Sequence, residues 1–178
     1  FSEGKNSFTI QEKRSKPTRG EHAVINMITI FVYGEIVDEK NKPVENINYT
    51  FNTHKLQISA AKNAASTLLI KYAISYISDA QAKENFNKEI KNNTFEDVTK
   101  EGKKAWDQVT NQIQVEGGTT AQKRTFYTSL YRTYERMVDV NEYGHYYSGY
   151  DKQVHKSKRP FYVDDWVWDT YLAQHPLR

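Results

Sequence analysis

YAISYISDAQAKENFNKEI, residues 72–90, contains the change of period that decides the fold. The stretch that overlaps its start, residues 66–78, is rich in β-branched and aromatic residues, which predicts a strand. Ser78 with Gln81 three residues later forms a capping box, which marks the start of a helix. Apolar residues then recur every four positions, as on one face of a helix: Ala82, Phe86 and Ile90. We therefore expect strands before Ser78 and helices after it.

The part of the chain before this change reads as β-structure. Residues 1–20 are polar and predict a loop with one short strand at Ser7–Gln11. The stretch Val24–Val37 predicts one long strand or two, and the polar residues 38–43 predict a turn that ends at a proline. Residues 46–53 alternate apolar and polar side chains, which predicts a half-buried strand.

Two further helices are expected after the first. Thr94 caps the second, with Asp97 three residues on, and the glycine pair 117–118 is expected to end it. Its apolar side comprises Val98, Ala105, Trp106, Val109 and Ile113. Thr119 or Thr120 caps the third. The apolar face of that helix comprises Phe126, Leu130, Tyr134 and Met137, widened by Tyr127 and Tyr131.

The last forty residues mix a ribbon with one more helix. Residues 139–160 are irregular and rich in tyrosine, and YYSGYD followed by KQVH predicts a short hairpin that turns at 151–152. Asp164 or Asp165 is expected to cap a final helix that runs to about His175. We find no internal repeat and no flexible linker, so the helices are expected to pack on the strands.

Composition limits the class of protein. A chain of 178 residues suffices for one medium domain or two small ones, and aromatic residues at 13% compensate for a hydrophobic content of only 38%. The net charge of +3 is spread along the chain without a basic block, which argues against nucleic-acid binding. The absence of cysteine excludes disulfides and thiolate zinc sites. No apolar run reaches the length of a membrane span, and FSEGKNSF at the start is not a signal peptide, so we expect a partial or processed chain.

Histidine spacing does not predict a metal centre. The five histidines are His22, His54, His145, His155 and His175. No two of them have the helical i, i+4 spacing of a metal site, and no HExxH motif occurs, so a zinc site is not expected. His175 is expected to bind carbonyl groups at the end of the final helix. Phosphate-loop, dinucleotide and nucleophile-elbow motifs are also lacking from the sequence.

Three aspartates near the end of the chain are the first candidates for chemistry. Asp165 and Asp169 are four apart and would share a helix face, with Asp164 beside them. Paired carboxylates can serve acid–base catalysis, but a role at the helix N-terminus is favoured for Asp164 and Asp165. Asp169 would lie one turn inside the helix between Trp168 and Tyr171, where a carboxylate needs a partner. A functional and a structural role for Asp169 are equally open from spacing alone.

The two tryptophans of this segment should have different roles. Trp166 and Trp168 are two apart on the expected helix and so face different ways. We expect one of them in the core and the other to be available as a stacking platform for a sugar or a base.

Four stretches, in this order, resemble glycoside hydrolase family 92, the calcium-dependent exo-acting α-mannosidases. They are YAISYISDAQAKENFNKEI (72–90), AWDQVTNQIQVEGGTTAQKRTFYTSLYRT (105–133), YYSGYDKQVH (146–155) and WDTYLAQHPL (168–177). Each is weak alone, but together they cover about residues 65–178.

The resemblance implies an α+β architecture that this chain contains only in part. Residues 1–78 would be the last strands of an N-terminal β-sandwich, 79–115 the linking helices, and 116–178 the truncated start of an (α/α)6 catalytic barrel. The implied reaction is hydrolysis of terminal α-mannosides with inversion, assisted by a calcium ion. The resemblance also implies a bacterial periplasmic or extracellular protein.

The same resemblance implies the site residues. Asp169 would face the terminal mannose with Trp168 beside it, and Trp166 and Tyr150 complete the expected substrate-binding set. The catalytic acid, the base and the calcium ligands would come from downstream sequence, so no catalytic residue and no metal ligand is expected in this chain. Leu172 stands where the family usually has arginine, which leaves linkage specificity open. The expected partners are mannose-containing glycans and the remainder of the same polypeptide, but not nucleic acid.

Two alternatives remain open from the sequence. In the first, the chain is a non-catalytic carbohydrate-binding module that uses the tyrosine-rich ribbon at 143–150 together with Trp166. In the second, it is a structural or interaction segment that docks a partner on one apolar helix face, formed by Phe126, Leu130 and Tyr134.

Overall fold

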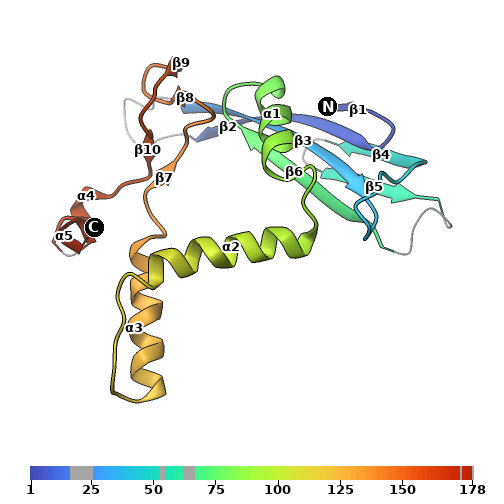
Figure 1. Ribbon diagram of the computed structural model, residues 1–178. Coiled ribbons are helices and arrows are strands. Elements are labelled where there is room, and N and C mark those ends of the chain that lie inside the picture. Colours follow the sequence, from blue (N-terminus) through green and yellow to red (C-terminus); the bar gives the residue numbers. More distant parts are fainter. Residues whose placement is uncertain (17–25, 53–54, 62–66, 173, 178) are drawn as a thin grey trace. The chain divides into compact units, whose positions relative to one another are not determined.

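A computed structural model of the chain contains both sheets and helices (Figure 1). The described residues are 1–16, 26–52, 55–61, 67–172 and 174–177. They divide into two compact units. The first comprises Phe1–Val98 and Tyr146–His155, and the second comprises Thr99–His145 and Lys156–Arg178.

A four-stranded antiparallel sheet organises the first unit. Its strands lie in the order β1 (Ser2–Glu3), β2 (Ser7–Lys16), β3 (Asn26–Val37) and β6 (Leu69–Ser75). The predicted strand at Ser7 is confirmed but runs past Gln11, because β2 pairs with β3 along its whole length. The long strand is a single one; Val24 lies outside the described residues. Gly34 of β3 is required, because a Cβ there would overlap the ring of Phe8.

A hairpin packs on one face of this sheet. β4 (Ile47–Asn52) confirms the predicted alternating strand, and its partner β5 (Lys55–Ala60) was not predicted. Alternate side chains of both strands are partly buried, as expected for strands with one covered face. They pack on a buried cluster of Phe8, Ile36 and Val44.

Helix α1 (Asp79–Glu89) packs on the opposite face of the sheet, where Figure 1 shows it beside β3 and β6. The Ser78 side chain accepts a hydrogen bond from the backbone N–H of Gln81 at 3.1 Å, so the predicted cap is confirmed. Ala82 and Phe86 are fully buried, and the ring of Phe86 meets that of Tyr33 edge-on, with 5.1 Å between centroids. The change of period at Ser78 thus places the first helix on the core.

Tyr33 is expected to make the free energy of unfolding of the first unit fall at high pH. Burial raises the pKa of Tyr33 to about 12, and the hydrogen bond that its hydroxyl donates to Glu35, at 2.8 Å, adds to the shift. Because the folded pKa lies above the unfolded value of 10.0, the stabilisation is complete below pH 10 and is lost as pH rises toward 12. We expect a loss of about 2–3 kcal/mol over that range.

This expectation can be measured by urea unfolding at a series of alkaline pH values, followed by circular dichroism. The Tyr33→Phe variant should show a clearly smaller loss, the remainder coming from groups such as Tyr49, whose pKa burial also raises to about 12. An equal loss in both proteins would contradict the assignment to Tyr33.

Two longer helices follow α1. The cap of α2 (Phe95–Thr110) is reciprocal as predicted, since Thr94 N donates to the Asp97 carboxylate at 2.9 Å and Asp97 N donates to Thr94 Oγ1 at 3.2 Å. The predicted end at residues 117–118 was wrong. The chain leaves the helix after Thr110, and the N–H of Val115 instead donates to the hydroxyl of Tyr127.

The apolar side predicted for α2 is not a core in the described structure. None of the residues of α2 is buried, and Trp106, 38% exposed, packs instead on Tyr131 of the next helix with ring centroids 4.3 Å apart. That next helix, α3 (Thr120–Thr133), has Thr119 as its N-cap, one of the two predicted residues, and Gln122 completes a capping box with it. Leu130 on its predicted face is buried.

The end of α3 also departs from the prediction. Tyr134 closes the helix as its C-cap, and its N–H bonds to Tyr131 O as a tight last turn. Met137, which was predicted on the helix face, therefore lies beyond the helix.

The remaining strands form two small ribbons. The predicted hairpin is confirmed as β8 (His145–Ser148) and β9 (Gln153–Lys156). β7 (Val138–Asp139) pairs with β10 (Tyr162–Val163) in the second unit.

The predicted final helix was wrong. The chain forms two short helices, α4 (Val167–Thr170) and α5 (Gln174–Leu177). Trp166 is the N-cap of α4, and no side chain caps it. A continuous helix would place the Pro176 ring against the carbonyl one turn before it, whereas in the first turn of α5 the missing N–H costs nothing.

Candidate functional site

The C-terminal segment of the second unit carries three of the four predicted sugar-binding residues. Both tryptophans are open to solvent, Trp166 at 57% and Trp168 at 88% exposure, and Asp169 is exposed as well. The prediction that one tryptophan lies in the core was therefore wrong. Thr170 is the sole buried residue of the four in α4, because so short a helix covers only one side chain against the unit.

The carboxylate of Asp169 is unpaired among the described residues. Its side chain has no hydrogen-bond partner within the described ranges, and it follows directly after the open indole of Trp168. We expected a shielded carboxylate, but α4 turns this side chain to water. A free carboxylate can accept two hydroxyl hydrogen bonds, and an exposed indole can stack on the apolar face of a sugar ring.

The other two aspartates are engaged in contacts. Asp164 accepts a hydrogen bond from the indole N–H of Trp166 at 3.2 Å, and Asp165 accepts one from the Thr170 hydroxyl at 3.1 Å. Neither caps α4, so the capping role predicted for them was wrong. Asp164 adopts a left-handed backbone with φ of 63°, which turns the chain out of β10 before α4 begins.

Side chains from both short helices hold this segment together. Thr170 is only 5% exposed, and its hydroxyl lies 2.9 Å from His175 Nε2. The same ring nitrogen lies 3.3 Å from Asp165 Oδ2. His175 thus contacts side chains rather than the helix-end carbonyls that we predicted for it.

The segment is also fastened to the end of α3. The amide of Gln174 donates to Thr133 O at 2.6 Å and to Arg136 O at 3.2 Å. The guanidinium of Arg136 lies 5.9 Å from the ring centroid of Trp166, within the range of a cation–π contact.

Tyr150, the fourth predicted residue, belongs to the first unit. It stands at the turn of the β8–β9 hairpin and is 99% exposed. The turn is fixed by a hydrogen bond from Lys152 N to Ser148 O at 2.8 Å and by a hydrogen bond between His155 Nε2 and the Asp151 carboxylate at 2.7 Å.

The carboxylate of Asp151 reinforces this turn. Desolvation raises the pKa of Asp151, but hydrogen bonds from Ser148, His155 and the backbone of Gln153 outweigh it, so the net shift is downward. The carboxylate therefore stays ionised and keeps the turn closed, with the ring of Tyr150 exposed at its tip.

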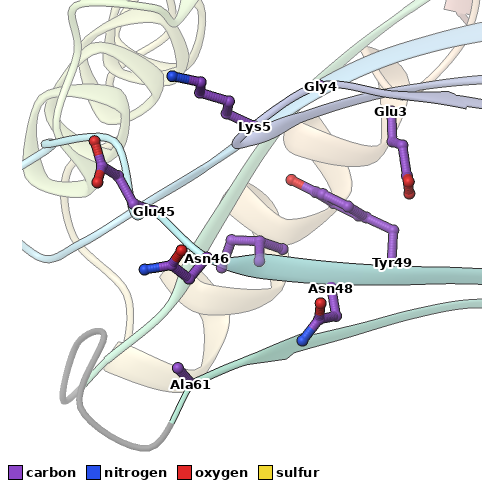
Figure 2. Close-up of a pocket in the computed structure, with 9 residues that line it drawn as sticks. Glu3, Gly4, Lys5, Glu45, Asn46, Asn48, Tyr49 and Ala61 are labelled. Carbon is purple, nitrogen blue, oxygen red and sulfur yellow. The ribbon is translucent and has the colours of Figure 1, made fainter.

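The first unit also contains an open hollow of about 470 Å³, which was not predicted from the sequence. Figure 2 shows its lining, which is largely polar, with Lys5, Glu45, Asn46 and Asn48 around it and the ring of Tyr49 reaching in from β4. The signal in the sequence is only the polar turn before β4, which is typical of any loop. None of the four predicted sugar-binding residues lines it.

Two further properties of the described residues bear on the site. No three histidine or acidic side chains in that part of the chain come together closely enough to hold a metal ion. No helix within the described ranges has the length and apolar character needed to cross a membrane.

The chain is similar in sequence to known glycosidases. The family model described as the glycosyl hydrolase family 92 catalytic domain matches residues 81–178. Over 124 residues the chain is 28% identical to an uncharacterized secreted glycosidase from Arthroderma benhamiae. That match covers 67% of this chain and 15% of the fungal protein.

Solved structures show the same likeness. The family GH92 inverting mannosidase BT2199 from Bacteroides thetaiotaomicron superposes with a TM-score of 0.68 at 27% identity, over 97% of this chain and 26% of that one. The family GH92 α-mannosidase BT3965 from the same organism gives a TM-score of 0.71 at 21% identity, over 98% and 25% of the two chains. The chain thus spans about a quarter or less of the length of these relatives. Since the family model matches more than half of its residues, the chain belongs to glycosyl hydrolase family 92.

Proposed function

We propose that this chain is part of a glycosidase that releases terminal α-linked mannose from glycans with inversion. Family membership supports a glycosidase, and the 27% identical structural relative is named an inverting mannosidase. We further propose that 1–78 are the closing strands of a β-sandwich, 79–115 the linking helices and 116–178 the start of an (α/α)6 barrel.

In this proposal the chain binds and orients the sugar. The observation that carries it is the exposed carboxylate of Asp169, unpaired in the described part of the chain, next to the open indole of Trp168. Asp169 accepts hydrogen bonds from two hydroxyls of the terminal mannose, and such charge-assisted bonds are among the stronger ones. Trp168 stacks on the sugar and Trp166 borders it.

Tyr150 is proposed as a separate contact to the glycan. Its ring is fully exposed, and hydrogen bonds fix the backbone of its turn, so the ring can pack on a sugar without rearrangement of the hairpin. Tyrosine suits this role because it has an apolar face and a hydroxyl.

The chemical step is assigned to residues outside this chain. Inversion requires an acid and a base about 6.5–9.5 Å apart with a water between them. We propose that the remainder of the polypeptide supplies this pair and the ligands of a calcium ion that helps to bind the mannose. The described residues offer no cluster that fits such an ion.

A location outside the cytoplasm fits this substrate. The curated fungal relative is named a secreted glycosidase. We propose a bacterial periplasmic or extracellular protein.

The test compares the full-length protein with this chain alone on an α-linked mannobiose. Proton NMR of the first product identifies the anomer, and inversion predicts β-mannose. We expect release by the full-length protein, its loss on chelation of calcium, and none by the isolated chain. Release of α-mannose first, or turnover by the chain alone, would show the proposal to be wrong. A β-linked mannobiose serves as the control substrate.

A further inference from the structure

We propose that Asp165, Thr170 and His175 are positioning residues that fix Trp168 and Asp169 in the orientation that meets the sugar. The inference rests on the proposed function of Trp168 and Asp169, and goes beyond it by assigning roles to three side chains that do not themselves touch substrate. Its basis is the geometry of the two short helices.

Burial is the first observation. Thr170 is 5% exposed, whereas the residues on either side of it, Asp169 and Tyr171, are exposed. A helix of four residues is too short to be stable in isolation. The orientation of α4 is therefore set by the contacts of its one buried side chain.

The hydrogen bonds of the Thr170 hydroxyl are the second observation. The Thr170 hydroxyl lies within 3.1 Å of Asp165 Oδ1 and of Trp166 O, and both of these groups can only accept. The hydroxyl has a single proton, which is directed toward these acceptors. His175 Nε2 lies 2.9 Å from this hydroxyl and 3.3 Å from Asp165 Oδ2. A lone pair on Nε2 would face the carboxylate oxygen, so we infer that Nε2 carries a proton and is the donor.

This arrangement links the two helices through one imidazole N–H. The neutral imidazole of His175 can donate this hydrogen bond when its proton is on Nε2. The protonated imidazole can donate it as well, because both of its nitrogens carry a proton. His175 itself is held near α3 by its neighbour Gln174, whose amide reaches Thr133 O and Arg136 O. The chain of contacts therefore runs from the end of α3 through α5 to Thr170, and so to the exposed pair Trp168 and Asp169.

The test has a functional arm on the full-length protein. Thr170→Val keeps the shape of the side chain and removes its hydrogen bonds. We expect KM for an α-linked mannobiose to rise about tenfold with kcat changed less than about threefold, as for lost binding geometry. Thr170→Ser should restore KM, and Thr128→Val, at an exposed position of α3, should leave it unchanged. An unchanged KM in Thr170→Val would overturn the proposal.

A second arm uses NMR of this chain and does not depend on activity. Nitrogen shifts should show the proton of neutral His175 on Nε2. The indole N–H signals of Trp166 and Trp168 should shift in His175→Ala and return in His175→Gln, which retains a donor. A proton on Nδ1, or unmoved indole signals, would overturn the network. If the unmodified full-length protein releases no mannose while these signals behave as expected, the proposed function fails and the positioning network stands.

Discussion

Replacement of Asp169 by alanine in the full-length protein is expected to lower kcat/KM for mannose release by about two to three orders of magnitude. Two hydrogen bonds from sugar hydroxyls to a carboxylate contribute about 1.5–3 kcal/mol each, and a loss of about 3–4 kcal/mol corresponds to this factor. Asp169 has no partner in the described structure, so its removal leaves no protein group unsatisfied. Stability should therefore stay within about 0.5 kcal/mol of the parent.

The measurement is steady-state hydrolysis of an α-linked mannobiose together with thermal unfolding. Asp107→Asn is a suitable control, since Asp107 forms an i, i+4 ion pair with Lys103 on α2 and should change kcat/KM little. Asp169→Asn should fall between the parent and Asp169→Ala, because an amide retains one acceptor. A loss of less than about fivefold in Asp169→Ala would refute the assignment of this residue to the mannose.

Replacement of Phe86 by alanine is expected to destabilise the first unit by about 3–5 kcal/mol, the range for truncation of a fully buried aromatic ring. Phe86 is 0% exposed and fills the space between α1 and the sheet, where it meets Tyr33 edge-on. The neighbouring Ala82 and Ala73 are too small to occupy the cavity that remains. Urea unfolding followed by circular dichroism measures the change.

Phe95→Ala is the matched control, because Phe95 is the same residue type at 69% exposure in the first turn of α2. It should change the free energy of unfolding by less than about 0.5–1 kcal/mol. Equal effects of the two substitutions would mean that Phe86 is not the centre of the first core.

Local signals account for the parts of the fold that the sequence predicted correctly. The caps at Ser78, Thr94 and Thr119 each depend on a side chain and a backbone N–H three residues away, so they can be read directly. The hairpin at 151–152 likewise depends on a few adjacent residues. For this reason, the order of strands followed by helices could be predicted.

Long-range contacts account for most of the errors. The length of β2 is set by pairing with β3, and β5 is a strand because it pairs with β4 and packs on Phe8 and Ile36. Trp166 and Trp168 are residue types that usually lie in a core, but in the described part of the chain the indole of Trp166 contacts Asp164 and Arg136, and both rings stay exposed. Such partners are not visible in a window of ten residues.

The candidate site was predicted only as a set of residues. The WDTYLAQHPL stretch led to Asp169 and Trp168 through the family resemblance, and their exposure agrees with a role in binding. The contacts around Thr170 could not be predicted, because they require the break between α4 and α5 that brings His175 back to Thr170.

The bonds from Gln174 to the end of α3 have a consequence for the order in which the second unit forms. Thr133 and Gln174 are 41 residues apart. Joining them costs about 3 kcal/mol of chain entropy, more than two amide hydrogen bonds at about 1 kcal/mol each return in water. Docking of α5 therefore depends on β7 and β10 pairing first, since this pairing shortens the open chain. The residues proposed to contact the sugar thus lie in the part of this unit that docks last. A sugar bound to them would stabilise the docked position of α5.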